Sequence, residues 1–135
     1  MSVKYRNYID GEWIESESGD TIEVTNPANT DEVVGVYQRS TGDDTERAIS
    51  AAAAASDGWA ATPAPERGRI LREAAGTLER RQDELVETLV REEGKTRSEA
   101  GEVGRAIDLF YYYAEKARDF GGPTKQSGDR NAELS

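Results

Sequence analysis

The chain has 135 residues, with 17 Lys and Arg against 27 Asp and Glu, so its formal net charge is -10. A surface this acidic repels nucleic-acid phosphates and anionic membranes, which excludes both as partners. The chain has no cysteine and no histidine. That excludes disulfides, a thiol nucleophile, a histidine base, and zinc sites of nitrogen and sulfur ligands within these residues.

The basic residues are mostly arginine, 13 Arg against 4 Lys. Together with the many carboxylates, this skew is typical of proteins from a high-salt cytoplasm, where salt screens carboxylate repulsion. An ordinary acidic protein is the alternative. No apolar run approaches the ~20 residues that span a bilayer, and the N-terminus has no apolar stretch of signal-peptide length. We therefore expect a cytoplasmic protein.

Residues 1–40 carry the signals of two strand pairs. Asp10-Gly11 lies between the short runs NYI and EWI, and an Asp-Gly pair in that position predicts a hairpin with a type I′ turn. The runs 21–25 (TIEVT) and 33–37 (VVGVY) predict a second pair. Turn residues fill NPANTDE between them, so we expect a longer connection there.

Residues 41–121 show helical periodicity. A capping box at Thr41 and Asp44 predicts the first helix, which ends before the proline-containing 62–66. Its expected buried positions are Ala48, Ile49, Ala52, Ala53 and Trp59. A second helix is expected from near Pro65, with the inner face Ile70, Leu71, Ala74, Ala75 and Leu78. After an interruption at 80–83, a third helix places Leu85, Val86, Leu89 and Val90 inward.

The stretch 91–103, REEGKTRSEAGEV, suggests several kinds of site. A phosphate-binding P-loop is excluded, because the motif needs glycine at position 89, which is Leu, and a strand before it. Gly94 instead suits the left-handed residue that ends a helix. A capping box at 96–99 predicts a fourth helix to about Phe120. Its expected apolar stripe is Val103, Ala106, Ile107, Phe110, Tyr111, Ala114 and Ala117.

The chain resembles the N-terminal portion of aldehyde dehydrogenases along essentially its whole length. NYIDGEWIES resembles that family's opening hairpin, and IEVTNPANTDEVVGVYQRST its Asn-Pro turn and following strand. LVREEGKTRSEAGEVGRAIDLFYYYAEKARDFGG resembles its Glu-x-Gly-Lys turn and long helix with paired tyrosines. Within the family, the sequence is most similar in appearance to archaeal semialdehyde dehydrogenases that oxidise 2,5-dioxopentanoate to 2-oxoglutarate.

The resemblance implies an α/β, aldehyde dehydrogenase-like fold. Residues 1–135 would be the N-terminal segment of the cofactor-binding domain: two strand pairs over 1–40, about four helices over 41–121, and a loop or cut end over 122–135. The complete nucleotide-binding sheet would be missing. The full-length protein would use NAD or NADP, oxidise a small-molecule aldehyde to an acid, and form a homo-oligomer, either a dimer or a tetramer.

In that family a cysteine thiolate attacks the aldehyde, hydride passes to the nicotinamide, and a glutamate activates the water that releases the acid. The segments that carry these groups lie beyond the residues matched here. We therefore expect no catalytic and no cofactor-binding residue in this chain, and no activity from it alone. The alternative is a free-standing, non-catalytic scaffold or interaction module built on the same fold segment.

The resemblance also implies one metal site. Some family members hold a sodium or potassium ion between an acid two residues before the turn glycine and backbone carbonyls beside the Asn-Pro motif. In this sequence that acid is Glu92, and the carbonyls are those of Val24 and Thr25. From the residues alone, Glu92 and Glu93 are either ligands of a hard cation or solvated acids in the last turn of a helix, and the second interpretation suits Glu93 better.

Overall fold

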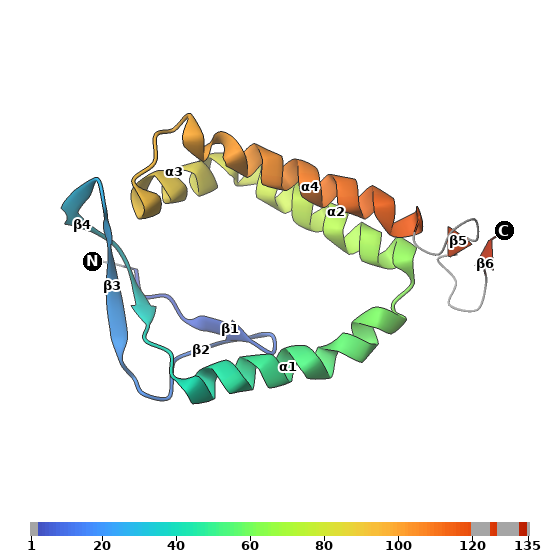
Figure 1. Ribbon diagram of the computed structural model, residues 1–135, viewed down its shortest axis with the longest axis horizontal. Helices are drawn as coiled ribbons and strands as arrows, with labels where there is room; N and C mark the ends of the chain where they lie inside the picture. Colours follow the sequence, from blue (N-terminus) through green and yellow to red (C-terminus); the bar gives the residue numbers. More distant parts are fainter. Residues whose placement is uncertain (1–2, 120–124, 127–132, 135) are drawn as a thin grey trace. The chain divides into compact units, whose positions relative to one another are not determined.

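The computed structural model describes residues 3–119, 125–126 and 133–134, drawn in colour in Figure 1. The chain divides into two compact units. The first unit comprises residues 1–57 and 88–96, and the second comprises residues 58–87 and 97–135. In the described residues, no helix is both long and apolar enough to cross a membrane.

The first unit begins with a short hairpin. Strands β1 (Asn7–Ile9) and β2 (Glu12–Ile14) pair antiparallel. The turn residues Asp10 and Gly11 have φ of 53° and 81°, which is the pair of positive φ angles that a type I′ turn requires. The predicted hairpin is therefore confirmed.

A second antiparallel pair follows, between β3 (Thr21–Asn26) and β4 (Asn29–Gln38). The predicted long connection is wrong, because the strands continue until only Pro27 and Ala28 separate them. The Asn26 side chain closes this tight turn by accepting a hydrogen bond from the Ala28 N–H at 2.9 Å. The register shifts between Val24 and Thr25 and again between Thr25 and Asn26.

Helix α1 (Gly42–Ala61) begins at the predicted capping box. The Thr41 N–H donates to Asp44 Oδ2 at 2.8 Å, and the Asp44 N–H donates to Thr41 Oγ1 at 3.3 Å. The predicted buried face of the helix is wrong, since Ile49 is 63% and Trp59 44% exposed. Alanines 52 and 53 are exposed as well, and only Ala48 is half-buried. The helix therefore has the predicted apolar face, but the described residues leave that face exposed.

The second unit is centred on two helices. Helices α2 (Ala64–Arg80) and α4 (Glu102–Lys116) lie side by side and run in opposite directions (Figure 1). Their buried side chains are Ala64, Ala75, Val103, Ile107 and Ala114. A Cβ at Gly68 would lie 2.5 Å from the Ala114 carbonyl oxygen, so the close approach of the two backbones requires glycine there.

Helix α3 (Gln82–Glu93) follows the predicted interruption, with Arg81 as the residue between α2 and α3. The start predicted for the fourth helix is wrong by several residues. A 3-10 turn, η1 (Glu99–Gly101), comes first, and Ser98 before it makes no side-chain cap hydrogen bond. This turn has the tighter i to i+3 pattern, with the Gly101 N–H donating to the Ser98 carbonyl at 3.3 Å.

After α4, a second 3-10 turn, η2 (Ala117–Asp119), ends the helical part. The predicted irregular end, 122–135, lies mostly outside the described residues. Within it, β5 (Lys125–Gln126) and β6 (Glu133–Leu134) pair antiparallel. Every sheet of the described residues has two strands, and four α-helices follow the first two pairs. This order confirms the predicted fold fragment.

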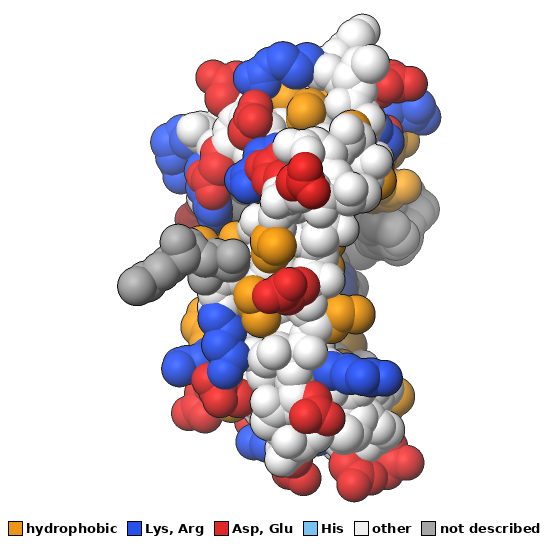
Figure 2. Space-filling view, turned by 90° about the vertical axis from the view of Figure 1, so that its left-hand side faces the viewer, with side chains coloured by type: hydrophobic (Ala, Val, Ile, Leu, Met, Phe, Trp, Pro, Cys, Tyr) orange, Lys and Arg blue, Asp and Glu red, His pale blue; other side chains and the backbone are white. Residues whose placement is uncertain are grey.

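Charged side chains of both signs are interspersed with exposed apolar ones on the face that Figure 2 presents. Several of the ion pairs join residues three or four apart in the chain, such as Arg69 with Glu73 at 2.5 Å and Arg81 with Glu84 at 2.6 Å. Their side chains are more than half exposed. Exposed pairs of this kind stabilise a fold by only about 0–1 kcal/mol each.

Candidate functional site

The turn after α3 packs against the β3–β4 hairpin within the first unit. Gly94 has φ of 68°, the left-handed conformation expected of the residue that ends a helix. A Cβ on Gly94 would lie 2.9 Å from Pro27 Cγ and 3.3 Å from the Ala28 nitrogen. Both the backbone angle and the close contact require glycine, and they bring the stretch 91–96 onto the Asn-Pro turn.

A polar chain joins the same two elements. The buried Asn26 donates from Nδ2 to Glu32 Oε2 at 2.9 Å, and Arg91 Nε donates to Glu32 Oε1 at 2.6 Å. These two hydrogen bonds, first that of Asn26 and then that of Arg91, lower the pKa of the Glu32 carboxyl below its ordinary value. Glu32 therefore stays ionised and fixes the end of α3 to the hairpin.

Glu92 lies near Tyr37 of β4, the strand that also carries Glu32. It is half-buried, and its carboxylate lies near the Tyr37 hydroxyl. Burial, followed by the negative charge of Glu92, raises the pKa of the Tyr37 phenol. Tyr5 stacks on Tyr37 with ring centroids 4.8 Å apart. The phenol is thus held in its protonated form, as a hydrogen-bond donor beside a carboxylate.

The predicted cation ligands belong to this same unit. Val24 pairs with Gly35 and Thr25 pairs with Val33, on either side of the first register shift. Such irregularities take backbone groups out of the regular ladder. The described residues contain no cluster of three or more acidic, cysteine or histidine side chains suited to a metal. The cation site at Glu92, Val24 and Thr25 stays a prediction.

Sequence reasoning missed the partners that connect these residues. Asn26 was visible as a turn residue, but its bond to Glu32 was not. The Glu32–Arg91 pair joins positions 59 apart in the chain, and no local pattern encodes such a distance. Tyr37 was read only as a strand residue. Tyr37 lies near Glu92 because α3 packs on the hairpin.

A second polar cluster joins the loop after β2 to the start of α1. Asp44 is 3% exposed and accepts hydrogen bonds from Ser16 Oγ at 2.6 Å and from the Glu17 N–H at 3.3 Å, besides those of Thr41. The Ser16 hydroxyl and then the Thr41 N–H lower the pKa of Asp44 from 3.8 to about 2. The predicted helix cap is thus also a tertiary link, and Ser16 is the partner that the sequence did not reveal.

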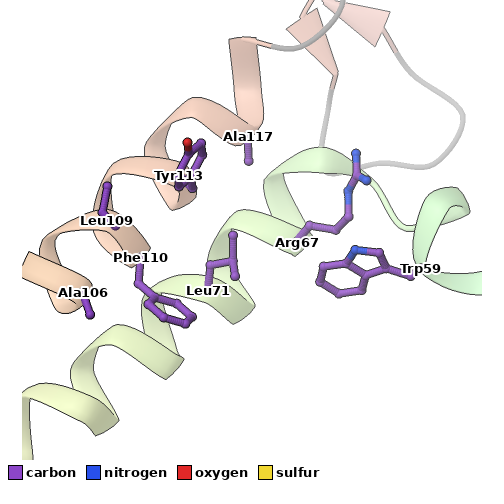
Figure 3. Close-up of a pocket in the computed structure, with 8 residues that line it drawn as sticks. All are labelled: Trp59, Arg67, Leu71, Ala106, Leu109, Phe110, Tyr113 and Ala117. Atoms are coloured by element: carbon purple, nitrogen blue, oxygen red, sulfur yellow. The ribbon is translucent and has the colours of Figure 1, made fainter. Parts of the chain in front are cut away.

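The second unit carries an apolar groove of about 540 Å³. Its lining residues come from the end of α1, from α2, from α4 and from η2 (Figure 3), and they are Trp59, Arg67, Leu71, Ala106, Leu109, Phe110, Tyr113 and Ala117. Leu109 is 47% exposed and Tyr113 is 55% exposed. Of the two aromatic residues in the predicted apolar stripe, Phe110 is 37% exposed, and Tyr111 is half-buried with its hydroxyl donating to Glu79 at 3.0 Å.

Comparison with known proteins agrees with this arrangement. The sequence profile described as "Aldehyde dehydrogenase family" matches residues 13–135. Alpha-ketoglutarate semialdehyde dehydrogenase of Haloferax volcanii is 56% identical over 99% of this chain and 28% of its own length. Alpha-ketoglutaric semialdehyde dehydrogenase of Bacillus subtilis is 41% identical over 95% of this chain and 26% of its own length.

A solved structure is similar as well. Betaine aldehyde dehydrogenase from Staphylococcus aureus, in complex with NAD+, superimposes with a TM-score of 0.83 and 33% identity, over 97% of this chain and 27% of that one. This chain thus spans about a quarter of the length of the proteins it matches. It corresponds to the N-terminal portion of these enzymes, and it belongs to the aldehyde dehydrogenase family.

Proposed function

We propose that this chain is the N-terminal segment of the cofactor-binding domain of an NAD- or NADP-dependent dehydrogenase. Its substrate is alpha-ketoglutarate semialdehyde, also called 2,5-dioxopentanoate, and its product is 2-oxoglutarate. The observation that carries the proposal is the 56% identity to the Haloferax volcanii enzyme of that name over 99% of the chain. The Bacillus subtilis relative, at 41% identity, bears a matching name.

The chemistry of this reaction depends on groups outside the chain. With no cysteine in 135 residues, the thiolate that would attack the aldehyde has to come from the remaining polypeptide. The same holds for the groups that would bind NAD or NADP. The contribution of residues 1–135 is a folded support, and the exposed groove of the second unit favours this role over a free-standing module.

The complete protein encoded by the gene of this chain tests the proposal. We expect the absorbance of reduced cofactor to rise with alpha-ketoglutarate semialdehyde and either NAD or NADP. Glutarate semialdehyde is the matched control, because it lacks only the 2-oxo group, and we expect a lower kcat/KM with it. Residues 1–135 alone should produce no reduced cofactor. A preference for glutarate semialdehyde would refute the substrate, and turnover by the short chain would refute its supporting role.

We also infer the setting of the complete enzyme. The 27 acidic residues and the arginine excess suit a cytoplasm of high salt, and the 56% identical relative comes from the archaeon Haloferax. A cytoplasmic enzyme of a halophilic archaeon fits both observations. We expect it to assemble as a homodimer or homotetramer, as the family resemblance implies.

The final part of the proposal is a sodium or potassium ion held by Glu92 with the carbonyls of Val24 and Thr25. Three observations support it: the half-buried carboxylate, the register shift beside Val24, and the contact of Gly94 with the Asn-Pro turn. One carboxylate with neutral carbonyl oxygens matches the charge of a monovalent ion better than that of Ca²⁺, which usually collects several carboxylates.

Thermal unfolding in different chloride salts tests the ion site. We expect the midpoint to rise with any salt, because salt screens the -10 net charge. Potassium or sodium chloride should raise it further than choline chloride at equal ionic strength, and Glu92→Gln should remove this difference. Glu93→Gln, at the more exposed neighbouring position, is the matched control and should keep it. Equal midpoints in all three salts would count against the ion.

A further inference from the structure

The chain contains two Asp-Gly pairs, Asp10-Gly11 in the turn of the first hairpin and Asp57-Gly58 in helix α1. In such a pair the backbone nitrogen of the glycine can attack the aspartate side chain, because glycine has no Cβ to obstruct the approach. The local sequence makes both pairs candidates for the same change of the backbone. Only their places in the fold distinguish them.

The side-chain surroundings of the two pairs are alike. All four residues are exposed, and a Cβ added to either glycine would meet no atom within 4 Å. Neither Asp10 nor Asp57 has a hydrogen bond or an ion pair with a residue that the structure describes. Access of water and steric hindrance are therefore the same at both pairs.

The backbones of the two pairs differ. Gly58 lies inside α1, where its N–H donates to the carbonyl four residues before it. Gly11 lies between β1 and β2 (Figure 1), and its N–H has no hydrogen bond with any described residue. Asp10, with φ of 53°, is the only non-glycine residue at positive φ in the described part of the chain. Since a hairpin of two three-residue strands is only marginally stable, the backbone at Asp10 changes conformation more easily than a 20-residue helix does.

We propose that Asp10 is a site of isoaspartate formation and that the fold protects Asp57 from the same reaction. The Gly11 nitrogen attacks Cγ of the protonated Asp10 carboxyl, and a C–N bond forms. One molecule of water leaves, made of the carboxyl hydroxyl and the N–H proton. A second water then opens the succinimide ring. Breaking the bond from nitrogen to Cγ restores aspartate, whereas breaking the bond from nitrogen to the former main-chain carbonyl carbon leaves the chain running through the side chain.

The product alters the hairpin. An isoaspartyl residue adds a carbon atom to the main chain inside the turn at Asp10, and the register of a hairpin is fixed by the type and length of its turn. The pairing of Ile9 with Glu12 and of Tyr8 with Trp13 is then lost. The contact between the Tyr8 and Trp13 rings, whose centroids lie 5.0 Å apart, depends on the same register. Formation of isoaspartate therefore releases β1 from β2.

Prolonged incubation of the complete protein in neutral buffer tests the proposal. Peptide mapping with electron-transfer dissociation measures isoaspartate at each position, because the added main-chain carbon changes the fragments. We expect isoaspartate to accumulate several-fold faster at Asp10 than at Asp57. The urea-unfolded protein is the control, since both pairs then have the same backbone freedom and should react at similar rates. Equal rates in the folded protein, or no isoaspartate at Asp10, would overturn the proposal.

Asparagine variants give a second measurement that does not depend on the substrate. Asp10→Asn and Asp57→Asn form the same ring with loss of ammonia instead of water, so the reaction appears as a gain in mass, and Asn-Gly also suits a type I′ turn. We expect Asp10→Asn to deamidate several-fold faster than Asp57→Asn, and equal rates would refute the protection by α1. Amide hydrogen exchange of residues 7–14 should be faster in the isoaspartate form of the protein. Unchanged exchange would refute the release of the hairpin.

Discussion

The two units of the chain are held together by different forces. In the first unit, single carboxylates with several donors join segments far apart in sequence, Glu32 to Arg91 and Asp44 to Ser16. In the second unit, α2 and α4 meet through alanine, glycine, Val103 and Ile107, and much of their apolar surface stays exposed. Both units leave large apolar side chains exposed, such as Ile49 in the first, but the links between distant segments are polar in the first unit and apolar in the second.

The difference shows which region depends on other polypeptide. A buried carboxylate is stable only when its hydrogen-bond partners are already in place, so the polar links of the first unit are complete in this chain. An exposed apolar side chain needs no particular partner, because burial against any surface of suitable shape gives the same free energy, about 1.5–3 kcal/mol for a large residue. Three substitutions test this difference between the units.

The core between α2 and α4 is the most sensitive place. Ile107 is 5% exposed, so Ile107→Ala leaves a cavity and should lower the free energy of unfolding by about 2–5 kcal/mol. Urea unfolding followed by circular dichroism measures this loss. Leu109→Ala on the same helix is the matched control, because Leu109 is 47% exposed, and its effect should stay within about 0.5 kcal/mol in residues 1–135. Equal losses would mean that the groove is already covered in the chain.

The turn at Gly94 is the next most sensitive. Gly94→Ala places a side chain at φ of 68°, which costs about 1–2 kcal/mol, and the new Cβ would press on Pro27. Gly101→Ala is the control, since Gly101 has φ of -59° and no atom within 4 Å of an added Cβ. We expect Gly101→Ala to be neutral or slightly stabilising. A neutral Gly94→Ala would show that the turn does not hold α3 on the hairpin.

Asp44 comes last, because the stability that it contributes depends on pH and is lost in acid. Its pKa falls from 3.8 to about 2 on folding. A depressed folded-state pKa gives stability that is present above pH 3.8 and is lost as the pH falls towards 2. Asp44→Asn should therefore flatten the fall of the unfolding midpoint between pH 4 and pH 2. Asp43→Asn, at the exposed neighbouring position, should keep that fall, and an identical acid profile for both variants would contradict the assignment.

The turns and helix ends show which local features could be predicted from the sequence. The Asp10-Gly11 turn, the cap at Thr41 and the end of α3 at Gly94 were predicted, because each depends on the conformational preference of one or two residues. The length of the β3–β4 connection and the start of α4 were not, since the strands extended through a bulge and a 3-10 turn precedes α4. These outcomes depend on small differences between competing local hydrogen bonds.

Composition, periodicity and short motifs are enough to give the order of two strand pairs and four helices, the acidic surface, the absence of a thiol and the family resemblance. Three findings came from the folded chain alone: Glu32 meets Arg91, Asp44 is buried against Ser16, and the described residues leave the apolar faces of α1 and α4 exposed. Periodicity states which side of a helix is apolar, but whether that side is covered depends on contacts between segments distant in the chain.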